Sequence, residues 1–171
     1  MGNLSLELKE MARSNGLCDK WFGEWVDESD DATLFDKYKR GIDFSIEHDW
    51  ISNEFIKSHW NKEVLQDNNI FVDDKDMELE NTKGTVIING DCDLTFNYNL
   101  FTVSDLYARH NSIVRVTAKD HARIMVNLYD NASVEINCDD MAKVYVYQHS
   151  KDSKIVSIGR VMPLIRKEVK K

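Results

Sequence analysis

The chain has 171 residues, 42% of them hydrophobic, and 30 Asp and Glu against 22 Lys and Arg give a formal net charge of −8. This length allows one domain, or two small ones, with a sizeable core. The acidic balance argues against direct binding to nucleic acid, because phosphate groups repel a negative surface.

Three cysteines, Cys18, Cys92 and Cys138, lie too far apart for a disulfide framework, and no CxxC pair suggests a zinc site. The N-terminal residues lack the apolar run of a signal peptide, and no stretch of about eighteen apolar residues could form a membrane span. We therefore expect a cytoplasmic protein in a reducing compartment, without a membrane partner.

Apolar residues at helical spacing predict a series of short helices in the first part of the chain. Leu17, Trp21 and Trp25 are spaced by four residues and mark one face of the second helix. Gly41 weakens the third helix or marks a bend in it. The expected helices cover residues 4–14, 18–26, 32–48 and 52–60, with a continuation or restart over 61–66.

The chain changes character near Asn81. An acidic link, Asp27–Asp31, interrupts the helices, and a short strand over Ile70–Val72 precedes a charged link that ends at Glu80. Residues 1–81 hold 20 Asp/Glu and 9 Lys/Arg, a net charge of −11, whereas residues 82–171 hold 10 and 13, a net charge of +3. We therefore expect an acidic helical domain or cap over 1–81, a repeat domain over 82–160, and a C-terminal cap with a basic tail over 161–171.

Aromatic residues are frequent between Trp21 and Trp60. They could form the core of a small helical domain, or dock on the first coil of the repeat domain. They could also line a groove for a partner, since Trp and Tyr dominate the energetics of protein interfaces.

From about Thr82 to Gly159 the sequence divides into eight consecutive blocks of ten residues without a gap. The third, fifth and seventh positions of a block are mostly apolar and alternate with polar residues, as in a strand with one buried face. Asn, Asp and Gly at the block ends favour tight turns. The fifth positions are all apolar: Val86, Phe96, Leu106, Val116, Val126, Ile136, Val146 and Val156.

Two architectures fit strand–turn units of constant length. In a β-solenoid, residues twenty apart stack on successive coils, whereas in an antiparallel meander neighbouring blocks pair as hairpins. The recurrence of Ala122, Ala132 and Ala142 at one block position favours the solenoid, in which a crowded corner returns on every coil. The predicted fold is α+β, a helical segment followed by a β-solenoid (β-helix). The helices and the segment Val161–Ile165 are candidates to cap its two ends.

Stacking at twenty residues predicts which polar side chains meet. His149 aligns with Tyr129 and then Arg109, and no two histidines align. Asp120 aligns with Asp140; a cation between them is one reading, and ordinary turn residues are the other. His110 and His121 could share a metal between adjacent coils, or lie exposed at turns.

The sequence contains no motif of catalytic chemistry: GxSxG, HExxH and the phosphate-binding P-loop are all missing. We therefore predict neither catalytic residues nor a cofactor or metal. Aromatic residues on a helix face, an acidic link and paired outward tyrosines instead suit protein contact. The predicted interaction surface consists of Trp21, Trp25, Asp27, Glu28, Asp30, Asp31, Tyr145 and Tyr147.

The segments Asn15–Trp21, Gly41–Phe44 and Asn53–Lys57 resemble a family of short uncharacterised proteins of gut bacteria and their mobile elements. The likeness covers most of the chain, including the repeat. It implies a prophage or mobile-element setting and brings no known activity with it.

Three functions follow as hypotheses. The first is a non-enzymatic protein-interaction or structural module, which includes self-association through a face or an end of the solenoid. The second is an inhibitor from a mobile element that uses the acidic helical half to occupy a basic nucleic-acid site on a host protein. The third is a cryptic enzyme or sugar-binding solenoid that uses Arg109, Tyr129 and His149.

Overall fold

The computed structural model describes residues 3–139, 141–158 and 164–167 of the chain. The chain divides into two compact units, a helical unit (Met1–His59) and a solenoid unit (Trp60–Lys171).

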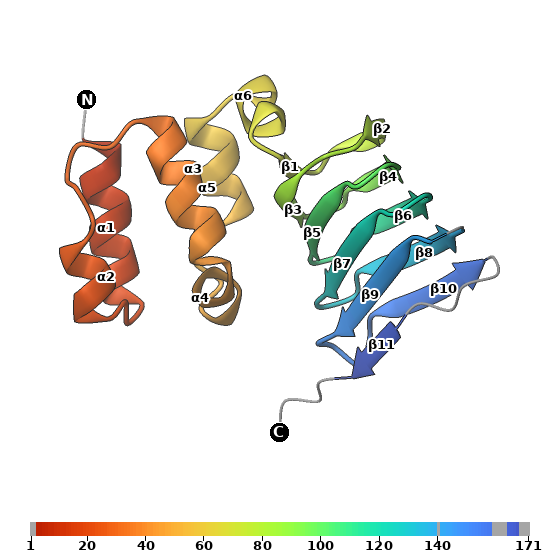
Figure 1. Ribbon diagram of the computed structural model, residues 1–171. Coiled ribbons are helices and arrows are strands. Elements are labelled where there is room, and N and C mark those ends of the chain that lie inside the picture. The colour runs from red at the N-terminus through yellow and green to blue at the C-terminus, as the bar shows by residue number, and fades with distance from the viewer. Residues whose placement is uncertain (1–2, 140, 159–163, 168–171) are drawn as a thin grey trace. The chain divides into compact units, whose positions relative to one another are not determined.

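The helical unit contains five short helices (Figure 1): α1 Leu4–Ser14, α2 Asp19–Gly23, α3 Asp31–Arg40, α4 Ile42–Glu47 and α5 Asn53–His59. Asn3 and Asp30 cap the N-termini of α1 and α3 by accepting hydrogen bonds from Leu6 N and Thr33 N. Gly41 separates α3 from α4, which confirms the expected bend. The second helix is shorter than residues 18–26, because it ends at Gly23, a poor helix former.

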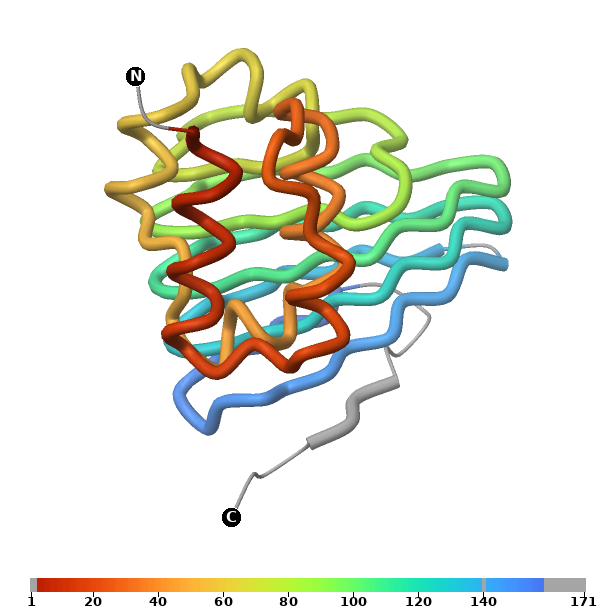
Figure 2. The backbone as a smooth tube through the Cα atoms, turned by 90° about the vertical axis from the view of Figure 1, so that its left-hand side faces the viewer, coloured from red at the N-terminus to blue at the C-terminus, as the bar shows by residue number. Residues whose placement is uncertain are grey.

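In its described residues, the solenoid unit begins with α6 (Lys62–Asp67) and continues through eleven strands. Every described strand pair is parallel, which excludes the antiparallel meander and confirms the solenoid. The sheet orders are β1-β3-β5-β7-β9-β11 and β10-β8-β6-β4-β2, so each coil contributes one strand to each sheet (Figures 1 and 2). The strands are β1 Ile70–Val72, β2 Lys75–Glu80, β3 Gly84–Asn89, β4 Asp93–Tyr98, β5 Val103–Ala108, β6 Ile113–Ala118, β7 Arg123–Leu128, β8 Ser133–Cys138, β9 Lys143–Gln148, β10 Lys154–Ile158 and β11 Leu164–Lys167.

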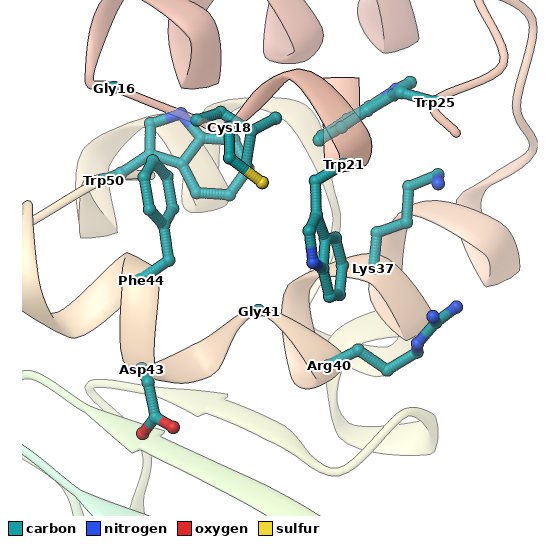
Figure 3. A pocket seen from close by; sticks show the side chains of 11 residues that line it. Gly16, Cys18, Trp21, Trp25, Lys37, Arg40, Gly41, Asp43, Phe44 and Trp50 are labelled. Carbon is teal, nitrogen blue, oxygen red and sulfur yellow. The ribbon is translucent and has the colours of Figure 1, made fainter. Parts of the chain in front are cut away.

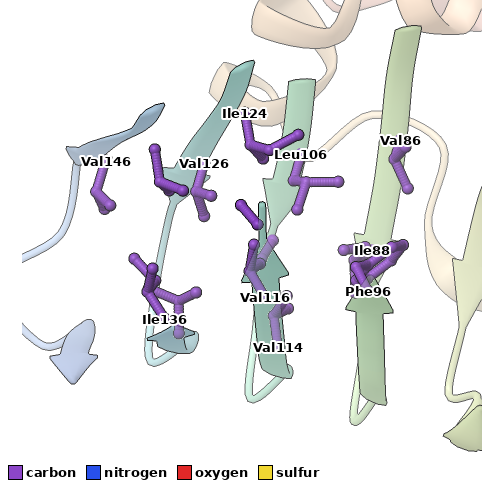
Figure 4. Packing of buried hydrophobic residues seen from close by; sticks show 14 of the residues in the cluster. Val86, Ile88, Phe96, Leu106, Val114, Val116, Ile124, Val126, Ile136 and Val146 are labelled. Carbon is purple, nitrogen blue, oxygen red and sulfur yellow. The ribbon is translucent and has the colours of Figure 1, made fainter. Parts of the chain in front are cut away.

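The ten-residue period gives the register of the coils directly. Val86 pairs with Leu106, Leu106 with Val126 and Val126 with Val146, so residues twenty apart lie on adjacent strands. The inward side chains form one core with Phe96, Val116 and Ile136 from the other sheet (Figure 4). All seven are at most 1% exposed. In the seven blocks that begin at Thr82 to Ala142, the fifth position therefore points into the core as predicted.

The corners of the coils explain the small and acidic block-end residues. Ala122, Ala132 and Ala142 are at most 2% exposed, which confirms the crowded corner. At the ninth block position, Leu100, His110, Asp120 and Asp130 adopt a left-handed backbone. The side chains of the two aspartates accept hydrogen bonds from backbone N–H groups one coil earlier: Asp120 Oδ2 from Leu100 N (2.8 Å) and Asp130 Oδ2 from His110 N (2.9 Å). These carboxylates satisfy backbone donors of the preceding coil. Their recurrence is therefore explained by their place in the turns, without a bound cation. Asp140 lies outside the described residues, so the predicted Asp120–Asp140 stack does too.

The charged link expected before Asn81 and part of the expected C-terminal cap are strands. Residues 75–80 form β2, because Met77 and Leu79 pack against the core between charged neighbours. This first coil therefore lies before the division expected at Asn81, and the compact units divide between His59 and Trp60. At the other end, Leu164–Lys167 pairs with β9 as a further strand, whereas 161–163 and the tail 168–171 lie outside the described residues.

The last block departs from the predicted phase. Val134 pairs with Ile155, a separation of twenty-one, and Ser153 rather than Asp152 is the buried corner residue. One extra residue in the preceding turn therefore reverses which side chains face inward. Val156 is 54% exposed, so the prediction that it points into the core is wrong.

This phase shift gives a paired test. We expect Ile155→Asp to lower the free energy of unfolding by more than about 1 kcal/mol, because it moves a charge toward the core. Val156→Asp on the neighbouring position should change it by less than about 0.5 kcal/mol, as surface substitutions do. Urea unfolding of the two variants measures both, and the reverse order of stability would contradict the register.

α6 covers the β1 end of the coils, and a buried carboxylate fastens it there. Asp74 is 2% exposed and lies after β1. Its Oδ1 is 2.7 Å from Lys62 Nζ and accepts from Gln66 Nε2 at 2.7 Å, while Oδ2 accepts from Val72 N at 3.0 Å. Asp74 thus joins two turns of α6 to the first strand.

Candidate functional site

The helical unit contains a hollow of about 300 Å³ whose walls are largely aromatic (Figure 3). Its apolar lining comes from Leu17, Trp21, Trp25, Phe44 and Trp50. We call it the aromatic hollow. Its size is at the lower end of ligand-binding clefts, enough for one large side chain of a partner.

Local sequence explains how these residues meet. Leu17, Trp21 and Trp25 follow the four-residue spacing that puts them on one side of α2 and its flanks. Gly41 forms part of the lining between α3 and α4, and a Cβ there would lie 3.2 Å from the Lys37 carbonyl oxygen. A side chain at this position would therefore be tight against the last turn of α3.

Trp50 is held against the hollow by an unusual backbone. Asp49 and Ile51, on either side of it, have φ angles of 47° and 56°. A β-branched residue such as Ile51 rarely adopts this conformation, and strain of this kind is concentrated at functional sites. The Trp50 backbone N–H donates to Ser45 O at 3.0 Å, which fixes the chain reversal after α4.

The rings pack edge to face. Trp50 lies 6.1 Å from Trp25 at 76°, and 5.7 Å from Phe44 at 65°. Trp25 donates from Nε1 to Ser5 Oγ at 3.1 Å, and Ser5 in turn donates to the Val26 carbonyl at 2.9 Å. Trp25 and Trp50 are 6% and 5% exposed and form the walls, whereas Trp21 and Phe44 are half-buried.

Two of the lining tryptophans have an indole nitrogen without a hydrogen bond among the described residues. Trp50 Nε1 is buried and makes no hydrogen bond within the part of the chain that the structure describes. Trp21 makes no hydrogen bond among the described residues either, and its nitrogen lies on the ring edge that faces Phe44 (Figure 3). A ligand in the hollow can reach the nitrogen of the half-buried Trp21, whereas Trp50 Nε1 has no exposed surface. A ligand that covered the Trp21 donor without accepting from it would leave a buried donor unsatisfied, at a cost of about 1–3 kcal/mol.

Two cations from α3 border the rings. Lys37 Nζ lies 5.2 Å from the Trp25 ring, and Arg40 Cζ lies 5.2 Å from the Trp21 ring. Their oxygen contacts are long, 3.4 Å from Lys37 Nζ to Glu24 O and 3.6 Å from Arg40 Nη1 to Asp36 Oδ2. Asp43 also borders the hollow, with its carboxylate directed away from the rings (Figure 3).

Cys18 gives chemical access to the hollow. It lines the hollow and is exposed, whereas Cys92 and Cys138 are buried. Burial raises the pKa of the Cys92 thiol to about 11, and burial also raises the pKa of Cys138. Because thiolates are the reactive form, an alkylating reagent at neutral pH should modify Cys18 selectively.

Of the predicted interaction residues, only Trp21 and Trp25 line the hollow. Asp27 forms an ion pair with Lys9 at 2.6 Å. Asp30 caps α3, and the hydrogen bonds from Thr33 lower its pKa. Two of the four acidic residues thus have local structural roles, while Glu28 and Asp31 are exposed.

Tyr145 and Tyr147 belong to the solenoid unit. They lie half-buried on the outward face of β9, in register with Met125 and Asn127 of β7. The predicted stack of His149 on Tyr129 is confirmed, with ring centroids 4.3 Å apart and planes 2° apart.

The polar residues considered for metal binding have other contacts. His110 Nδ1 accepts from Gly90 N at 2.9 Å, and the His121 ring stacks on Phe101 at 4.9 Å. Across the described residues, no group of His, Cys, Asp or Glu is placed to hold a metal ion.

Sequence reasoning did not single out Lys37, Arg40 or Asp43 as lining residues. They come from two different helices, so no spacing pattern links them to Trp21. Phe44 and Trp50 were among the aromatic residues noted for the helical part, and their number was the available signal.

Comparisons of the chain with protein-family models, curated proteins and solved structures find no match. None of the described helices has the length and apolar character needed to cross a membrane.

Proposed function

We propose that this protein is a non-enzymatic interaction module whose helical unit binds a partner protein through the aromatic hollow. The observation that supports this most is a hollow with four aromatic walls and the indole donor of Trp21, which makes no hydrogen bond within the described residues. Buried aromatic pockets of this kind hold the few anchor residues that supply most of the energy of an interface. The partner inserts one large apolar side chain.

The hollow also lacks the features of a catalytic site. Its titratable side chains are Cys18, Lys37, Arg40 and Asp43, from three elements, and no hydrogen bond joins any two of them within the described chain. A nucleophile and its base would need to be within hydrogen-bond reach of each other. Recognition is therefore the better-supported role.

A peptide-display selection tests the proposal. The full chain is used to select from a library of random short peptides, and the selected peptides are measured against Trp21→Ala and Val26→Ala. We expect peptides with an aromatic or large aliphatic residue, and a dissociation constant raised about 30-fold by Trp21→Ala, the size of an interface hot spot. Val26 is 62% exposed and does not line the hollow, so Val26→Ala should leave binding unchanged.

Alkylation of Cys18 gives a second readout. A bound peptide should slow modification of Cys18, because this thiol lines the hollow. Circular dichroism of both variants checks that the helices are retained. Selected peptides that bind Trp21→Ala as well as the unaltered chain, and leave Cys18 reactive, would refute the proposal.

Self-association through the C-terminal coil is a second candidate within the same class. β10 is the last strand of its sheet, and Val156 and Ile158 on it are 54% and 50% exposed. An exposed apolar edge strand is a template for pairing with another chain. Light scattering at increasing concentration would show a dimer that Ile158→Lys abolishes, whereas a monomer at all concentrations removes this candidate.

A further inference from the structure

We infer that the aromatic hollow recognises a carboxylate held next to an apolar anchor, which means an acidic residue beside a large apolar side chain in the partner. This inference rests on the proposed function and adds the chemistry of the ligand. Three observations carry it: the unpaired indole donor of Trp21, the cations of α3, and ring faces already occupied by those cations.

The indole donor of Trp21 favours an acceptor in the ligand. Its nitrogen makes no hydrogen bond within the described residues and faces Phe44 across the hollow (Figure 3). A purely hydrocarbon anchor would bury this donor and leave it unpaired, at a cost in affinity. An anchor with an oxygen acceptor avoids that cost.

The cations select a negative acceptor over a neutral one. Lys37 and Arg40 both border the hollow, and their contacts with oxygen atoms at 3.4 and 3.6 Å are longer than those of strong charge-assisted hydrogen bonds. The one carboxylate of the lining, Asp43, is directed away from the rings (Figure 3). A ligand carboxylate next to Lys37 and Arg40 could therefore accept shorter hydrogen bonds from them than Glu24 O and Asp36 Oδ2 do.

The alternative occupant of an aromatic cage is a cation. Ammonium groups bind over the faces of Trp and Tyr rings, and four aromatic walls could suggest such a ligand. Here the side chains of Lys37 and Arg40 already lie over Trp25 and Trp21 at 5.2 Å. A second cation would be repelled by both, so the geometry favours an anion.

Three probes that share one ring and differ in charge test the inference: indole-3-acetate, indole-3-acetamide and tryptamine. Each is titrated into the full chain, and binding is followed by protection of Cys18 from alkylation and by ligand-observed NMR. We expect the acetate to bind about fivefold tighter than the acetamide, the size of a partly exposed ion pair, and tryptamine to bind more weakly than either. Added salt should reduce the preference for the acetate.

Charge-removing variants assign the preference to the two cations. Lys37→Gln combined with Arg40→Gln should abolish the preference for the acetate and leave binding of the acetamide in place. Lys20→Gln, on α2 outside the lining, is the matched control and should keep the preference.

The outcomes separate this inference from the proposed function. Equal binding of acetate and acetamide, or a preference for tryptamine, overturns the carboxylate inference while the hollow remains a binding site. Absence of binding by all three probes also overturns it, and the peptide selection then decides the proposed function on its own.

Discussion

Replacing Val126 by Asp is expected to unfold the solenoid unit. Val126 is fully buried and sits in the middle of a column between Leu106 and Val146. A carboxylate there would have no partner, and the cost of burying it is comparable to the whole free energy of unfolding of a domain, about 5–15 kcal/mol. In a repeat fold each coil is stabilised mainly by its neighbours, so loss of the middle coil affects the coils on both sides.

Circular dichroism and urea unfolding measure this effect. Arg123→Asp is the matched control, because it introduces the same residue on the same strand at an exposed, outward position. It should change the free energy of unfolding by less than about 0.5 kcal/mol. If the Asp variant cannot be recovered in folded form, Val126→Ala gives a milder measurement, with an expected loss of about 2 kcal/mol for the deleted methyl groups and the cavity. Equal stability of Val126→Asp and Arg123→Asp would contradict the inward direction of the column.

This column was predictable from the sequence because a solenoid repeats one environment at one interval. The fifth positions from Val86 to Val146 share a chemical character, and parallel strands twenty residues apart keep it in register. The interval of twenty residues between paired strands is not kept at the two ends of the solenoid. A terminal coil has another coil on one side only, so it does not share the environment that the middle coils repeat. The coil of β1 and β2 pairs at an offset of seventeen, as between Ile70 and Ile87, and the last block is shifted by one residue so that Ile155 replaces Val156.

The turn aspartates show where pattern alone is insufficient. Asp120 and Asp130 at one block position could be read either as cation ligands or as turn residues. The structure shows that each accepts a backbone hydrogen bond from the preceding coil. That partner lies twenty residues away in the sequence, so it becomes visible only with the coil.

The aromatic hollow could be predicted only in part. Trp21 and Trp25 follow the helical spacing of one segment and were identified from it. Phe44, Trp50 and the two cations reach the same hollow from α3, α4 and the chain reversal at Asp49–Ile51. A β-branched residue such as Ile51 has no local preference for a left-handed backbone, so the sequence around it does not predict the chain reversal.

Asp74 holds α6 against the β1 end of the solenoid unit. We expect Asp74→Ala to lower the free energy of unfolding by about 2–4 kcal/mol, because three donors lose a charged acceptor. Two of these donors, Lys62 Nζ and Gln66 Nε2, are on α6, and the third is the backbone N–H of Val72 in β1. The Val72 N–H is buried and would be left without its acceptor, which is the most costly part of the change.

Hydrogen exchange locates this loss. Amides of β1 and β3 should exchange faster in Asp74→Ala than in the unaltered chain, while those of β7 change less, because the first coil can open before the middle ones. Glu78→Ala removes a carboxylate from the exposed side of β2 and is the matched control, with an expected change of about 0.5 kcal/mol. Uniform acceleration along all strands would show that Asp74 acts on the whole unit rather than on its end.

The ion pair between Lys62 and Asp74 also makes the stability of the folded chain depend on pH. The hydrogen bond and the charge of Asp74 raise the pKa of Lys62 above its usual 10.5, so the folded chain holds this proton more tightly than the unfolded one. The contribution of the pair is therefore complete below pH 10.5 and is lost as the pH rises through the raised pKa of the folded state. Lys62 is largely exposed, so this contribution is small, and Lys62→Gln should cost less than about 1 kcal/mol. The difference in stability between the unaltered chain and Lys62→Gln should shrink on the alkaline side of pH 10.5, whereas the buried hydrogen bond from Val72 N should keep Asp74→Ala less stable there.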